Sequence, residues 1–218
     1  MAYTFPLTLA QFMQILPIRE MSFTLGGAVE ISETEGGEIL TAALGTRLWE
    51  GDIFLDDMTR DEAGDVMAML ELLRGSGARF MVYDLARPGP RLDISGVGLA
   101  SFSPKLLSVS GTTREISLSG LPASYALRRS DYLSFSYGSD PVRYALHRVA
   151  APVSASVGGV TPLFEVSPNI RPGFALNANV TLLKASCKAV VVPGSIQAGR
   201  HKATMTTGVS FKFKQTLR

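Results

Sequence analysis

Apolar residues between positions 45 and 91 change from strand-like to helical spacing and back again. Residues 48–55 have the pattern of a strand. The apolar residues after them recur at the spacing of one buried helical stripe: Ala63, Val66, Met67, Leu70 and Leu73. Residues 79–85 have the pattern of a second strand, and the prolines at 88 and 90 interrupt the chain after it. The pattern predicts a strand–helix–strand unit with its helix at about residues 60–74.

Polar residues define both ends of this predicted helix. Thr59 and Glu62 have the spacing of a capping box, in which each side chain accepts a hydrogen bond from a free amide at the helix start. Asp61, Glu62 and Asp65 place negative charge near the positive end of the helix dipole. Gly75 is a natural C-terminal stop. The helix is therefore predicted from its caps as well as from its periodicity.

Helical spacing disappears from residue 92 onward, where short apolar runs alternate with Gly, Ser and Pro. Many short strands between regular turn signals are typical of a β-sandwich or small barrel. The strands are predicted at residues 106–110, 115–118, 132–137, 143–149, 162–166 and 180–185. Residues 188–193 and 208–217 add two more, and in the last one Lys212 and Lys214 alternate with apolar residues, so that one face is wet and basic.

These patterns predict a mainly β protein with one main α-helix. We expect residues 1–91 and 186–218 to form one β-sandwich-like module that carries the helix. Residues 92–185 would form an inserted all-β module, a small barrel or sandwich. At 218 residues with 46% hydrophobic content, the chain is long enough for two such cores.

The net charge of +2 hides a strong asymmetry along the chain. Residues 1–93 carry 15 acidic and 7 basic residues, whereas residues 166–218 carry eight basic residues and no acidic one. The basic residues are spread among strand-like runs, without the clusters or aromatic pattern of a nucleic-acid surface. We therefore expect the acidic and basic ends to lie beside each other, within one subunit or across a subunit boundary.

Candidate chemistry is sparse. His147, His201 and Cys187 have no metal-ligand or catalytic spacing, and His147 is expected to be an outward-facing strand residue. An acid pair or a metal site is conceivable only in one group of carboxylates, which helix capping explains more simply: Asp56, Asp57, Asp61, Glu62 and Asp65. No enzyme activity, cofactor or metal is predicted. No run of residues is long and apolar enough for a membrane span, and no secretory signal is recognised.

Trp49, the only tryptophan, has two interpretations. It is either a core residue or an anchor at a subunit interface, where aromatic residues are enriched. Lys212 and Lys214 form the basic face of the last predicted strand, which could meet an acidic surface of a neighbouring subunit. Together with Trp49 they are the candidate subunit-interface residues.

Two groups of residues resemble the distal tail (Dit-like) proteins of long-tailed, siphovirus-type bacteriophages and related prophage or tail-like particles. The first lies in the strand–helix–strand unit, at residues 45–49, 73–75 and 80–85 with Pro88 and Pro90. The second lies in the β-rich half, at residues 130–135, 144–149, 158–159 and 166–171, with Ser130 where the pattern has a glycine before Asp131.

The resemblance implies a structural protein of the virion, made in the host cytoplasm and located at the tail tip or baseplate. Such proteins form a ring, usually a homohexamer, that joins the tail tube to the baseplate hub and tail-fibre proteins. The helix-carrying module would form the ring and the inserted module would face outwards. No catalytic residue carries over, no membrane is involved, and nucleic acid is contacted only indirectly, if DNA passes through the ring.

Three alternatives remain open. The β-module could bind a carbohydrate or receptor on a baseplate through Tyr125, Tyr132 and Tyr137, since exposed aromatic residues are common in glycan sites. The chain could also be another tail component, such as a tube, terminator or hub protein. An enzyme such as a cell-wall hydrolase would need paired carboxylates or a metal set that the sequence does not provide.

Overall fold

The computed structural model describes residues 3–27, 29–43 and 45–218. It confirms a mainly β protein in which α1 (Arg60–Leu73) is the only α-helix of the described residues. Two compact units are present: a helix unit (residues 16–78 and 190–216) and a barrel unit (residues up to 15, 79–189 and 217–218). These bounds differ from those of the predicted modules, and the division into a ring module and an inserted module stays a prediction.

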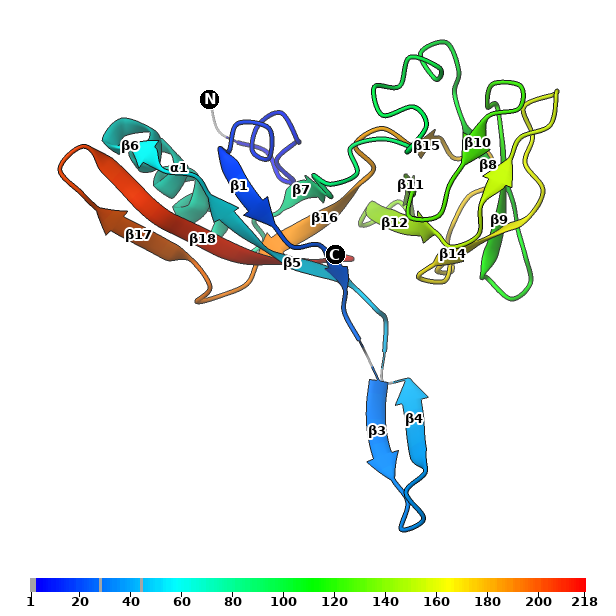
Figure 1. The fold of residues 1–218 in the computed structure, drawn as a ribbon, viewed down its shortest axis with the longest axis horizontal. Coiled ribbons are helices and arrows are strands. Elements are labelled where there is room, and N and C mark those ends of the chain that lie inside the picture. Colours follow the sequence, from blue (N-terminus) through cyan, green and yellow to red (C-terminus); the bar gives the residue numbers. More distant parts are fainter. Residues whose placement is uncertain (1–2, 28, 44) are drawn as a thin grey trace. The chain divides into compact units, whose positions relative to one another are not determined.

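The helix unit is built on an antiparallel sheet that combines strands from distant parts of the sequence (Figure 1). β5 (Trp49–Leu55) pairs with β18 (Met205–Gln215), so the C-terminal strand lies next to a strand of the acidic half. Around them are β1 (Ile18–Met21), β2 (Thr24–Leu25), β6 (Met58–Thr59) and β17 (Gln197–His201). The alternation predicted for β18 is confirmed: Val209, Phe211 and Phe213 are buried, whereas Lys212 and Lys214 are exposed.

The helix α1 starts at the predicted capping box. The Thr59 hydroxyl accepts a hydrogen bond from the Glu62 amide at 3.4 Å, and Glu62 Oε2 accepts one from the Thr59 amide at 2.9 Å. Asp61 and Glu62 lie in the first turn, whereas Asp65 lies beyond it. Four residues of the predicted stripe are buried, which fixes the face that the helix turns to the core: Ala63, Val66, Leu70 and Leu73.

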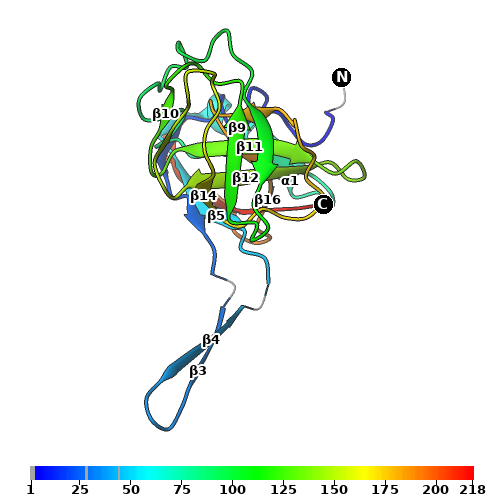
Figure 2. The same ribbon diagram turned by 90° about the vertical axis from the view of Figure 1, so that its right-hand side faces the viewer.

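The barrel unit contains a six-stranded antiparallel sheet (Figure 2). Its order is β15 (Val180–Thr181), β11 (Tyr132–Tyr137), β12 (Arg143–Val149), β14 (Phe164–Ser167), β9 (Glu115–Ser119) and β8 (Lys105–Val109). The sheet closes on itself, because the Leu106 amide donates to the Ala178 carbonyl at 3.0 Å and the Asn177 amide to the Leu106 carbonyl at 2.7 Å. Apolar side chains fill the interior, as in other small barrels.

Three shorter pieces complete this unit. β10 (Ala126–Leu127) pairs with β13 (Val153–Ser154), and β7 (Phe80–Tyr83) pairs with β16 (Ser186–Val191), which runs to the boundary with the helix unit. The N-terminal segment contributes one bridge from Leu7 to Phe80.

The predicted strand at residues 180–185 is too long, since β15 ends at Thr181. Lys184 adopts a left-handed backbone with φ 46°, and its amide donates to the Pro88 carbonyl at 2.6 Å. The chain therefore leaves the barrel sheet after two residues.

A separate hairpin is formed by β3 (Val29–Glu33) and β4 (Ile39–Ala43). The two strands form a two-stranded sheet of their own and, among the residues that the structure describes, pair with no other strand (Figure 1).

Candidate functional site

The two candidate interface lysines are paired within the chain. Lys212 lies opposite Asp52 in the β5–β18 ladder with Nζ 3.2 Å from Oδ1, and Lys214 lies opposite Glu50 with Nζ 3.0 Å from Oε2. The acidic and basic halves therefore meet inside one subunit at this position. Because all four side chains are partly exposed, each ion pair contributes at most about 1 kcal/mol.

These pairs line a shallow polar groove of about 370 Å³ in the helix unit, next to Ser22 and Thr24. The Ser22 hydroxyl donates to Asp52 Oδ2 at 3.2 Å, so the carboxylate has a second partner. The charged side chains of this groove are paired with one another, and the Ser22 hydroxyl is hydrogen-bonded. The groove therefore shows no arrangement of acid, base or nucleophile. Whether Lys212 and Lys214 also contact a neighbouring subunit stays a prediction.

Trp49 is in the core of the helix unit, with 1% of its surface exposed. Its ring centroid lies 5.3 Å from that of Phe23, which lies 5.6 Å from Phe213. The Trp49 amide donates to the side chain of buried Gln215 at 3.2 Å. Of its two interpretations the core placement is observed, and a role at a subunit interface stays a prediction.

The carboxylates before and within α1 serve the local backbone. Asp56 Oδ1 accepts a hydrogen bond from the Asp57 amide at 2.9 Å. The hydrogen bond from the Thr59 amide, followed by that from its hydroxyl, lowers the pKa of Glu62 below its usual value. Among residues 3–27, 29–43 and 45–218, no group of three or more His, Cys, Asp or Glu side chains is arranged to hold a metal ion.

His147 is buried inside the barrel unit, so its prediction as an outward-facing residue is wrong. Its ring stacks on Phe135 with centroids 5.6 Å apart, and Nδ1 donates to the Pro168 carbonyl at 2.7 Å. Nε2 has no hydrogen-bond partner among the described residues. Burial, opposed by the Pro168 hydrogen bond and helped by the charge of Arg171, lowers the His147 pKa to about 4. His147 is thus a neutral core residue near pH 7.

The barrel unit should lose about 2 kcal/mol of stability between pH 7 and pH 5 through His147. Its folded pKa of about 4 lies below the usual 6.5, so the unfolded chain takes up the proton first as the pH falls. The contribution is complete above pH 6.5 and is lost towards pH 4. Hydrogen exchange of the β11 and β12 amides at several pH values measures it, and His147→Gln should flatten the profile in this range. An unchanged pH profile in that variant would contradict the prediction.

Two further polar groups of the barrel unit are buried for structural reasons. Burial raises the pKa of the Cys187 thiol, which disfavours the reactive thiolate. Lys188 Nζ donates to the Val142 carbonyl at 2.9 Å and lies 5.9 Å from the centroid of the Tyr144 ring. Burial, followed by the charges of Arg79 and Arg143, lowers the Lys188 pKa.

The three tyrosines considered for glycan binding do not form an exposed platform. Tyr132 and Tyr137 are buried, and the guanidinium of Arg148 donates to the Tyr132 hydroxyl and covers its ring. Tyr125 is half-buried and donates to Asp93 Oδ2 at 3.2 Å. The hydroxyls of Tyr125 and Tyr132 are hydrogen-bonded, and the Tyr137 ring lies in the core of the barrel unit.

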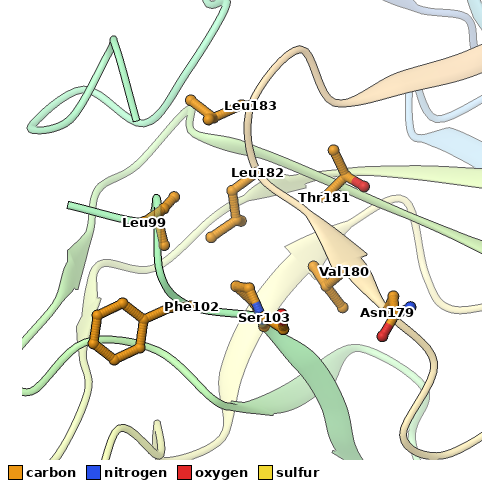
Figure 3. A pocket seen from close by; sticks show the side chains of 9 residues that line it. Leu99, Phe102, Ser103, Asn179, Val180, Thr181, Leu182 and Leu183 are labelled. Carbon is orange, nitrogen blue, oxygen red and sulfur yellow. The ribbon is translucent and has the colours of Figure 1, made fainter. Parts of the chain in front are cut away.

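A shallow pocket of about 300 Å³ lies in the barrel unit beside β15 (Figure 3). Leu99, Phe102 and Ser103 approach it from one segment, and residues 179–183 from another. Phe102 is 45% exposed, and the nearby polar groups are the uncharged side chains of Ser103, Asn179 and Thr181. Such a lining can hold a small, weakly polar ligand but supplies no acid, base or nucleophilic thiol.

Sequence reasoning missed the most exposed apolar feature of the helix unit, the β3–β4 hairpin. Val29, Ile31, Ile39 and Leu40 are 47%, 69%, 65% and 52% exposed. The available signal was the pair of β-branched runs on either side of Gly36-Gly37.

No helix in the described part of the chain has the length and hydropathy required to cross a membrane. In comparisons with known proteins, no family model matches the chain, and no curated protein matches it.

Proposed function

We propose that the chain is a structural protein of the tail tip of a long-tailed bacteriophage or a related particle, where it forms a ring that joins the tail tube to the baseplate hub. One observation carries this proposal: the helix unit combines β5, a capped helix and the C-terminal strand β18 in one packing unit, next in sequence to a separate β-barrel unit. This is the combination that the resemblance to distal tail proteins implies.

The physics of ring formation supports the same proposal. A closed ring requires a heterologous contact, in which one surface of a subunit meets a different surface of the next. The helix unit has two unlike exposed elements, the acidic β3–β4 hairpin and the outer strand β17. The proposed partners are further copies of the chain, in the hexamer that the resemblance implies, together with the tube and hub proteins.

Electron microscopy of the purified full-length chain tests the proposal. Closed rings in negative stain, with a mass in sedimentation that corresponds to a small whole number of subunits, are the expected result. On particles of the virus that encodes the chain, an antibody against it should label the end of the tail away from the capsid. A chain that is monomeric at every concentration, or an antibody that labels another part of the particle, would refute the proposal.

A further inference from the structure

The β3–β4 hairpin presents an exposed apolar face. Cross-strand neighbours point to the same side of a sheet, and the register pairs Ile31 with Thr41 and Glu33 with Ile39. Val29, Ile31 and Ile39 therefore share one face, and all three are at least 47% exposed. A hairpin of two strands is at best marginally stable alone in water, so such a face gains stability when another surface covers it.

The hairpin is also strongly acidic. Residues 29–43 contain four glutamates, at positions 30, 33, 35 and 38, and no Lys or Arg. None of the four takes part in a salt bridge in the described part of the chain. The covering surface should therefore carry positive charge, and the main-chain groups along the hairpin edges favour an exposed strand as partner.

The edge strand β17 has both properties. Within the described residues it pairs only with β18, so its other side is open. Arg200 in β17 and Lys202, the residue after its end, are exposed, and no salt bridge between described residues involves them. In contrast, Lys212 and Lys214 are each paired with a carboxylate of their own chain. β17 is thus a basic edge whose charges remain available.

We propose that the β3–β4 hairpin of one copy docks against β17 of a second copy, with its apolar face covered in the contact and with Glu33, which lies on that face, opposite Arg200 and Lys202. This inference rests on the proposed ring function and names the surfaces of its subunit contact. The two surfaces differ, so the contact is heterologous and can repeat around a ring. The apolar residues supply affinity, and the charges select the partner and its orientation.

The apolar part is tested in the full-length chain with Ile31→Thr/Ile39→Thr, which keeps β-branched residues in both strands. Sedimentation velocity over a concentration series should show subunit association at least about tenfold weaker than in the wild type. The matched control is Val97→Thr/Val157→Thr, at two apolar residues of the barrel unit that are 78% and 87% exposed. This control should associate like the wild type. Circular dichroism and Trp49 fluorescence verify that each variant is folded.

The electrostatic part is tested by charge reversal. Glu33→Lys and Arg200→Glu/Lys202→Glu should each weaken association, because like charges then face one another. An equimolar mixture of the two variants should recover association, since each hairpin then meets an opposite charge on the other chain. Added salt should weaken the wild-type contact.

The outcomes separate this inference from the proposed function. Rings that form equally well in the hairpin variants, or charge-reversed chains that do not recover on mixing, would overturn the docking contact and leave the ring intact. Hairpin-dependent pairs or open chains without closed rings would support the contact and refute the ring. A wild-type chain that never associates would overturn both.

Discussion

Gly51→Ala is expected to destabilise the helix unit by about 3 kcal/mol or more. A Cβ atom at this position would lie 1.9 Å from the Ser22 carbonyl oxygen and 3.0 Å from the ring of Phe213. The oxygen belongs to backbone, which cannot rotate away, and Gly51 lies in the middle of β5, opposite Phe213 in the β18 register. Either β5 or the backbone at Ser22 must therefore move.

Denaturant unfolding followed by Trp49 fluorescence measures this effect, because the only tryptophan of the chain lies in the core of the helix unit. Gly64→Ala is the matched control. Gly64 lies inside α1, and a Cβ there would meet nothing within 4 Å. This control should gain up to about 1 kcal/mol from helix propensity. An unfolding midpoint of Gly51→Ala equal to that of the wild type would show that the close approach is absent.

The second large effect is expected for Asp131→Ala, which should cost the barrel unit about 4 kcal/mol. Asp131 is fully buried, and its two carboxylate oxygens accept hydrogen bonds from the amides of Arg91 at 2.9 Å and Arg128 at 2.7 Å. Alanine would leave both amides without their acceptor. Asp131 thus joins the segment that follows Pro90 to the start of β11.

Faster hydrogen exchange in β11 and β12 is the expected readout, since the barrel unit has no tryptophan. Asp131→Asn retains one acceptor oxygen and should be less affected. Asp140→Ala, at an exposed position of the same unit, should exchange like the wild type. Equal exchange in the Asp131→Ala and Asp140→Ala variants would contradict the assigned role of the buried carboxylate.

The elements predicted best are those whose signals lie within their own residues. α1 begins at a capping box and has one buried stripe, so its position followed from local chemistry. β11 and β12 have the predicted bounds, residues 132–137 and 143–149, because a turn separates two runs of β-forming residues. Local consistency of this kind requires no knowledge of distant contacts.

The missed features depend on residues far away in the sequence. β17 is a run of Gln, Ala, Gly, Arg and His without an apolar alternation, and it is a strand because β18 pairs with it. His147 was assigned to solvent from its residue type, whereas the packing around β12 places it inside the barrel unit. The Gly51 contact depends on the backbone of Ser22, which no spacing rule reveals.

At the level of the candidate site, composition indicated that acidic and basic segments meet, and the β5–β18 ion pairs show one such meeting. Composition alone did not indicate which charged side chains have no ion-pair partner, because that depends on strand register. Exposed apolar residues in a short hairpin likewise have the same sequence pattern as buried ones. The surfaces proposed for assembly could therefore be recognised only from the structure.

The closure of the barrel sheet has a consequence for how the two units can recognise partners. Main-chain bonds between β8 and residues 177–178 occupy the edges that an open six-stranded sheet would offer, so a partner of this sheet must be recognised through side chains. A strand edge such as β17 instead offers backbone groups, which every amino acid carries. Substitutions on the barrel surface can therefore change what is recognised there, while an edge contact tolerates them and keeps the assembly constant.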